Sequence, residues 1–117
     1  MGQVLAPETG AELLGWSPRR SSHALADGRP LTLYVQFTPE GAAVSDLGGT
    51  LPLIRRLPPL ARIAVRATCR TNDVQIDRGT LVLHVPPGGD VSEAVDRLGR
   101  VCAQLSRRAS EPGYPSW

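Results

Sequence analysis

The sequence predicts an α+β fold, in which one antiparallel sheet of four to five strands packs against two or three helices. Three observations support this. Residues 31–37 alternate between apolar and polar side chains directly after an Asp-Gly turn signal, which is typical of a β-hairpin. Two short apolar segments surround Arg78-Gly79 and predict a second hairpin. Residues 90–109 repeat apolar residues at helical spacing and predict a long C-terminal helix.

The length of 117 residues suits one hydrophobic core, so we expect a single domain over residues 1–117. Its ordered core should cover about residues 6–109, and the Pro-containing segment 110–117 should form a tail. Aromatic residues make up only 4% of the chain, so the core must be aliphatic. An aromatic stacking surface for single-stranded nucleic acid is therefore disfavoured.

Before the first hairpin, residues 7–14 predict a short helix. Pro7 suits a first helical position, Glu8 and Glu12 favour its N-terminal end, and Gly15 would end it. Trp16 would then pack onto the core.

The first strands form a meander. We expect a loop or strand entry over residues 17–22, a short strand over residues 23–26, and a type I′ turn at Asp27-Gly28. Residues 31–37 form the clearest strand, and residues 42–47 return beside it after a turn that contains Pro and Gly.

Two helices follow the meander. Gly48-Gly49 ends the strand, and Thr50 can cap a short helical segment that extends to Leu57. Pro58-Pro59 ends that segment and opens a second helix over about residues 60–70. Asn72 should stop this helix, because Asn tolerates the left-handed conformation.

The second hairpin joins residues 74–77 to residues 81–85. Asp90 is a good N-cap for the last helix, and Glu93 three residues later gives the start of that helix a capping-box pattern. Gly99 weakens the predicted helix, because glycine is a poor helix former.

Little in the chain suggests chemistry. His23 and His84 have no companions at metal-ligand spacing, and Cys69 and Cys102 each lie in an apolar helical pattern, which is typical of buried thiols. We therefore expect no catalytic residues, no metal and no cofactor. With neither a signal peptide nor an apolar membrane segment in the sequence, we expect a cytoplasmic protein without a membrane partner.

Asp46 is the acid with the most suggestive surroundings, since it precedes Gly48, Gly49 and Thr50 at a strand end. A carboxylate there can cap backbone N–H groups of the turn or of the next helix. A phosphate-binding loop is the alternative, but the segment lacks the spaced glycines and the Lys of such loops. A catalytic role would need a partner such as His84 or a metal. We predict a structural cap and turn.

Arginines provide the candidate binding site. Arg62, Arg66 and Arg70 recur every four residues along one helix face, and Arg55 and Arg56 precede them. No acidic residue lies between Asp46 and Asp73. These five arginines are predicted to bind a partner or a phosphate, and a solvated outer face is the simpler alternative.

The segment 27–51 carries an Asp-Gly turn, an alternating strand and the sequence Val-Ser-Asp-Leu-Gly-Gly-Thr-Leu over residues 44–51. Over about residues 20–109 the chain resembles a family of small uncharacterised bacterial proteins, a domain of unknown function with a strand followed by a Ser/Thr-Asp-x-Gly-x-Thr turn. Leu47 stands where a second Asp is expected, which argues against paired catalytic acids. The resemblance implies no activity, but it implies an association with prophage or defence genes.

These observations predict a non-enzymatic protein-interaction or regulatory module, either a homodimer or a subunit of a larger bacterial or phage-related assembly. A nucleic-acid-binding regulator that uses the Arg-rich helix is one alternative. A secretion-chaperone-like dimer is a second, because those folds also place a sheet between terminal helices, although they tend to be acidic. A small enzyme around Asp46 and His84 is the third.

Overall fold

The computed structural model describes residues 15–110. The helix predicted over residues 7–14 and the tail after residue 110 lie outside the described residues. The elements in chain order are β1 (Ser17–Ala24), β2 (Pro30–Thr38), β3 (Gly41–Ser45), α1 (Leu51–Arg56), α2 (Pro59–Thr71), β4 (Val74–Asp77), β5 (Thr80–Val85) and α3 (Val91–Ser110).

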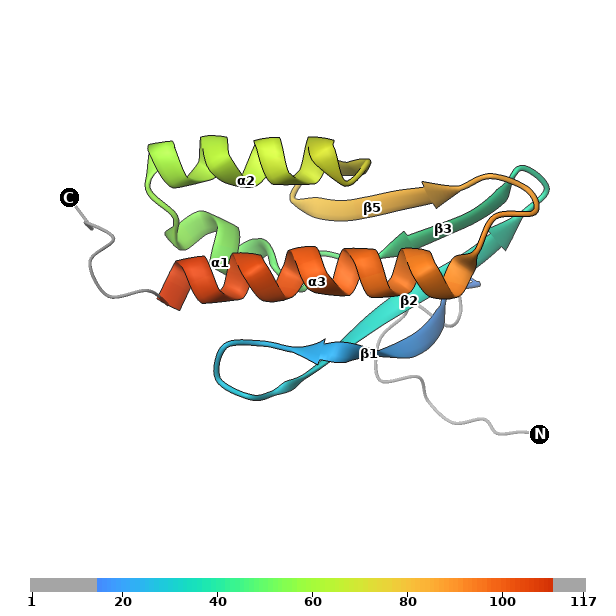
Figure 1. The fold of residues 1–117 in the computed structure, drawn as a ribbon, viewed down its shortest axis with the longest axis horizontal. Coiled ribbons are helices and arrows are strands. Elements are labelled where there is room, and N and C mark those ends of the chain that lie inside the picture. Colours follow the sequence, from blue (N-terminus) through green and yellow to red (C-terminus); the bar gives the residue numbers. More distant parts are fainter. Residues whose placement is uncertain (1–14, 111–117) are drawn as a thin grey trace.

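The five strands form one antiparallel sheet in the order β1-β2-β3-β5-β4. In Figure 1, α2 and α3 lie side by side on one face of this sheet. The long helix α3 contacts β1, β2, β3 and β5, whereas α2 packs against β4 at the sheet edge. The predicted α+β fold with its C-terminal helix is confirmed. None of the described helices is long and apolar enough to cross a membrane.

The core forms where the apolar face of the sheet meets the helices. The register places Val44 between Val35 and Leu83, so that three adjacent strands present apolar side chains at the same level. All three residues are buried. From the helices, α2 contributes Ala61, Val65 and Cys69, and α3 contributes residues such as Leu98, Val101, Cys102 and Leu105. The core is aliphatic, as expected from the few aromatic residues.

The first hairpin differs from its prediction. β1 spans Ser17–Ala24, so the segment 17–22, expected as a loop or strand entry, is part of the strand itself. Only Gly28 has a positive φ, of 86°, and a type I′ turn would also require one at Asp27. The loop is longer: the Leu25 N–H donates to the Arg29 carbonyl, and the Gly28 N–H donates to the Leu25 carbonyl. The Asp27 carboxylate accepts hydrogen bonds from the backbone N–H and from the guanidinium of Arg29.

The second hairpin, in contrast, is a tight two-residue turn. Arg78 and Gly79 both have positive φ, of 54° and 82°, and Asp77 pairs with Thr80 across the turn. These angles have the sign that a type I′ turn requires. β4 has the predicted bounds, and β5 begins one residue earlier than predicted.

Two details of the helix ends differ from the predictions. Thr50 occupies the N-cap position of α1, but its side chain makes no capping hydrogen bond. Asn72 ends α2 as its C-cap, as predicted, but its φ is −101°, and the left-handed residue is Asp73, with a φ of 60°. The Asn72 side-chain amide donates to the Thr68 carbonyl instead, which closes the last turn of the helix.

Candidate partner-binding surface

Asp46 is a buried carboxylate whose two oxygens are both engaged. Oδ1 accepts hydrogen bonds from the backbone N–H groups of Gly48, at 3.0 Å, and of Leu81, at 2.8 Å. Oδ2 accepts from the Thr50 N–H, at 3.0 Å, and from the Thr50 hydroxyl. The side chain therefore closes the Gly48-Gly49 turn and links the end of β3 to β5. Thr50 fails to cap α1 because its hydroxyl is directed to this carboxylate.

The structure does not bring His84 to Asp46. His84 is exposed and lies opposite Ala43 in the pairing of β3 with β5. Asp46 follows Ser45, at the other end of that ladder. Between residues 15 and 110, no group of three His, Cys, Asp or Glu side chains is arranged to hold a metal ion.

His23 contributes to a link between β1 and α3. Its Nε2 lies 3.0 Å from Asp96 Oδ1, and the hydroxyl of Ser22 donates to the same oxygen at 3.3 Å. Asp96 also pairs with Arg100, one turn further along α3. The sequence gives no signal for this cluster, because His23 and Asp96 are 73 residues apart in the chain.

Arg62 differs from the other arginines that were predicted as a stripe. Its Nε donates to the Leu57 carbonyl at 2.9 Å, and its Nη2 donates to the Arg55 carbonyl at 3.1 Å. These contacts close the turn between α1 and α2, so Arg62 has a structural role there. The side chains of Arg55, Arg56, Arg66 and Arg70 are exposed.

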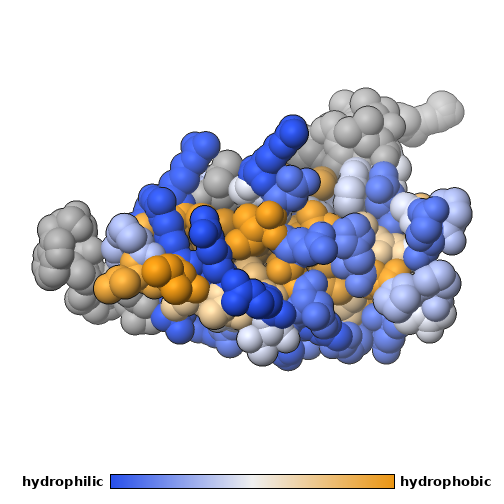
Figure 2. Space-filling model, turned by 90° about the horizontal axis from the view of Figure 1, so that it is seen from above, coloured by the Kyte–Doolittle hydropathy of each residue, from blue (hydrophilic) through white to orange (hydrophobic). Residues whose placement is uncertain are grey.

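α2 exposes apolar residues on the side that faces away from the core. Leu60 is 80% exposed and Ile63 is 62% exposed, and Ala67 follows one turn later. At 100° per residue these three side chains point opposite to Val65, which is buried. We call Leu60, Ile63 and Ala67 the α2 stripe. Figure 2 looks onto the molecule from this side and shows apolar surface bordered by long hydrophilic side chains.

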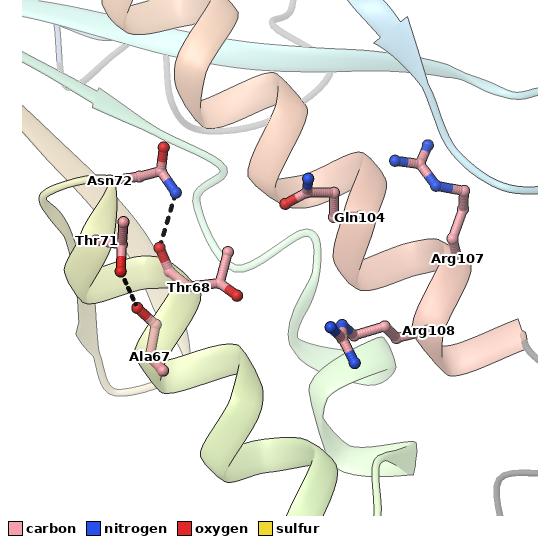
Figure 3. A pocket seen from close by; sticks show the side chains of 7 residues that line it. All are labelled: Ala67, Thr68, Thr71, Asn72, Gln104, Arg107 and Arg108. Carbon is pink, nitrogen blue, oxygen red and sulfur yellow. Dashed lines mark hydrogen bonds between the residues drawn. The ribbon is translucent and has the colours of Figure 1, made fainter.

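A groove runs along one flank of the α2 stripe, between α2 and α3. It encloses about 500 Å³ and is lined by Ala67, Thr68, Thr71, Asn72, Gln104, Arg107 and Arg108. In Figure 3, Gln104 reaches from α3 toward α2. The hydroxyls of Thr68 and Thr71 donate to carbonyls of their own helix. Ala67 belongs to both the stripe and the groove, so the two form one continuous surface.

The other flank of the α2 stripe carries Arg66 and Arg70, since these positions follow Ile63 by three and seven residues. Positive charge thus lies on both sides of the stripe, since Arg107 of α3 belongs to the lining of the groove, although its guanidinium is directed away from α2 in Figure 3. No acidic residue occurs in residues 47–72 or in residues 97–110. Asp73, the acid nearest to Arg70 in the sequence, pairs with Arg97, with 3.6 Å between its Oδ2 and the Nη1 of that arginine.

The sequence analysis identified Arg66 and Arg70 but missed Leu60 and Ile63. A signal was present. In α2 the apolar residues fall on two opposite arcs of the helix, one with Ala61, Val65 and Cys69 and the other with the α2 stripe. A helix at the edge of a small domain can bury only one arc, so the second is left on the surface.

Comparison with protein-family models, with curated proteins and with solved structures finds no match for this chain. The resemblance to a family of small bacterial proteins with the Ser/Thr-Asp-x-Gly-x-Thr turn therefore stays a prediction.

Proposed function

We propose that this chain is a protein-interaction module that binds its partner through the α2 stripe. One observation carries the proposal: Leu60 and Ile63 are largely exposed, one turn apart, on a well-formed helix. Burying a Leu or Ile side chain contributes roughly 1.5–3 kcal/mol. Two such residues next to arginines form a typical centre for a protein interface, in which apolar contacts give affinity and Arg gives specificity.

The environment of Asp46 argues against a catalytic role for this residue. Its oxygens accept four hydrogen bonds from within the turn and from β5, so the carboxylate serves to hold the fold together. A general base needs a lone pair directed at a substrate.

A nucleic-acid-binding regulator is the second candidate. It is favoured by four exposed arginines, Arg55, Arg56, Arg66 and Arg70, in a stretch without acidic residues. Such binding would weaken steeply with salt in a gel shift with duplex or single-stranded DNA. Leu60 and Ile63 argue against this candidate, because apolar side chains in the middle of the surface give phosphates no contact.

Copurification of a tagged chain from its source cells tests the proposed function. We compare the wild type with the double variant Leu60→Asp/Ile63→Asp and with Phe37→Asp as a matched control. Phe37 is 63% exposed and lies near the turn between β2 and β3, away from α2. A partner should be recovered with the wild type and the control but lost with the double variant.

All three proteins should show the same circular dichroism and similar melting temperatures, because the replaced side chains are exposed. Equal recovery of the partner by the double variant would show that the α2 stripe is not the binding surface.

A further inference from the structure

The shape of the α2 stripe restricts what can bind it. Leu60 and Ala67 are seven residues apart, so the stripe is about 10 Å long and runs along the helix axis. It is narrow, because Arg66 and Arg70 lie on one side and the groove with Gln104 and Arg107 lies on the other. A straight, narrow apolar surface of this kind matches the apolar face of another helix.

The charges beside the stripe restrict the partner further. Arg66, Arg70 and Arg107 place positive charge on both flanks, and the acid-free segments 47–72 and 97–110 provide no carboxylates to neutralise it. A helix that docks on the stripe therefore gains most when carboxylates border its own apolar face on both sides.

A second copy of this chain fits poorly on the same surface. Two α2 helices packed on their stripes would bring both copies of Arg66 and Arg70 close together without any acidic residue from α2 between them. A different protein that carries carboxylates on the facing surface removes this repulsion.

We propose that the partner segment is an acidic amphipathic helix, with apolar residues at positions i, i+3 or i+4 and i+7 and with Asp or Glu on both sides of them. This inference rests on the proposed function of the α2 stripe. Its apolar residues cover Leu60, Ile63 and Ala67, one row of carboxylates faces Arg66 and Arg70, and the other row lies over the groove, where the long Arg107 side chain of α3 turns toward it on binding.

Three synthetic helical peptides with the same apolar stripe test this partner class. Their flanking positions carry Glu, Gln or Lys, and binding to the intact chain is followed by fluorescence anisotropy. We expect the Glu peptide to bind about tenfold more tightly than the Gln peptide and the Lys peptide not to bind. The affinity of the Glu peptide should fall several-fold between about 0.05 M and about 0.5 M NaCl.

Variants locate the bound peptide. The affinity for the Glu peptide should fall by roughly two- to fivefold per arginine removed, both in Arg66→Gln/Arg70→Gln and in Arg107→Gln. Arg78→Gln, at the tip of the second hairpin, is the matched control and should bind like the wild type.

The outcomes separate the two proposals. Equal binding of the three peptides, no binding of the Glu peptide at low salt, or binding that is insensitive to the arginine variants each overturns the acidic-helix inference. The copurification result would still stand in those cases, because it depends only on Leu60 and Ile63. If a DNA duplex binds more tightly than the Glu peptide through the same arginines, the acidic-helix inference is overturned and nucleic acid is the ligand of this surface. Self-association in light scattering that Ile63→Asp abolishes would instead make a second copy the partner.

Discussion

Asp46 is the single residue on which most of the local structure depends. Its carboxylate accepts three backbone N–H groups and one hydroxyl in a buried position. Without it, these donors would be buried without partners, and each such donor costs about 1–3 kcal/mol. The carboxylate therefore holds the Gly48-Gly49 turn and ties the end of β3 to Leu81 of β5.

Asp46→Asn should lower the free energy of unfolding by about 1–3 kcal/mol, because an amide nitrogen would face the Thr50 N–H in place of a carboxylate oxygen. Urea unfolding followed by circular dichroism measures this change. Asp77→Asn replaces an exposed acid at the end of β4 and should be neutral. If both variants unfold like the wild type, the turn does not depend on the carboxylate.

The two thiols give a prediction for alkaline pH. Burial, assisted by the negative charge of Asp46, raises the pKa of Cys69 to about 11 and raises that of Cys102 further. Between the ordinary thiol pKa near 9 and a pH of about 11, the unfolded chain loses these protons and the folded chain keeps them. The stability should therefore fall as the pH rises through this window.

Urea titrations at several pH values measure this fall, and the Cys69→Ala variant provides the comparison. The stability of the variant should decline less steeply between about pH 9 and about pH 11 than that of the wild type. Identical slopes would mean that Cys69 ionises as readily in the folded chain as in the unfolded one.

Single residues also show where prediction from sequence stops. The spacing of Arg62, Arg66 and Arg70 places them on one helix face, but it cannot separate their roles. Arg62 donates to the carbonyls of Leu57 and Arg55, and these atoms come within its reach only because the chain turns between α1 and α2. Leu60 was assigned to the helix correctly, whereas its exposure depends on how α2 sits on the sheet.

At the scale of elements, the bounds of strands and helices were predicted well where a turn or capping residue marks the end of the element. Arg78-Gly79 and Asp90 predicted the second hairpin and the start of α3, where the Asp90 carboxylate accepts the Glu93 N–H. β1 was predicted too short because its residues from Ser17 to Ser22 are mostly polar and exposed. As an edge strand, β1 is held by its pairing with β2 and by α3, and apolar alternation is not required.

The contact between α3 and β1 depends on Gly99, which the sequence marks only as a weak point of the helix. A Cβ at Gly99 would lie 2.2 Å from the Ser21 Oγ and 3.2 Å from its Cβ. The Ser21 hydroxyl accepts the His23 N–H, so it cannot turn away without losing that bond. Glycine thus allows the helix to approach the strand closely.

Gly99→Ala should destabilise the fold by about 1–3 kcal/mol, although Ala is the better helix former by about 1 kcal/mol. Thermal unfolding measures the change. Ser21→Ala removes the Oγ that an added Cβ at Gly99 would meet. The double variant should therefore lose less stability than the sum of the losses of the two single variants. Ser92→Ala, at an exposed position in α3, is the control. A stabilising Gly99→Ala would mean that α3 does not press on β1.

At the scale of the whole molecule, apolar and charged residues are distributed unevenly. The acids of the described residues are concentrated near the hairpins and the first half of α3, where several of them pair with arginines. Within residues 15–110, the surface over α2 and the second half of α3 combines exposed apolar residues with arginines and lacks acids. The sequence reveals the charge asymmetry directly, but only the fold shows that both basic segments border the same apolar stripe.

The central claim is that the α2 stripe contacts a partner protein, and site-specific photo-crosslinking in the source cells tests it most directly. A photoreactive phenylalanine analogue replaces Ile63 in one variant and Phe37 in another, since both side chains are exposed to the same extent within one percentage point. We predict a discrete covalent adduct from position 63 and none from position 37. Adducts from position 37 with none from position 63 would contradict the account.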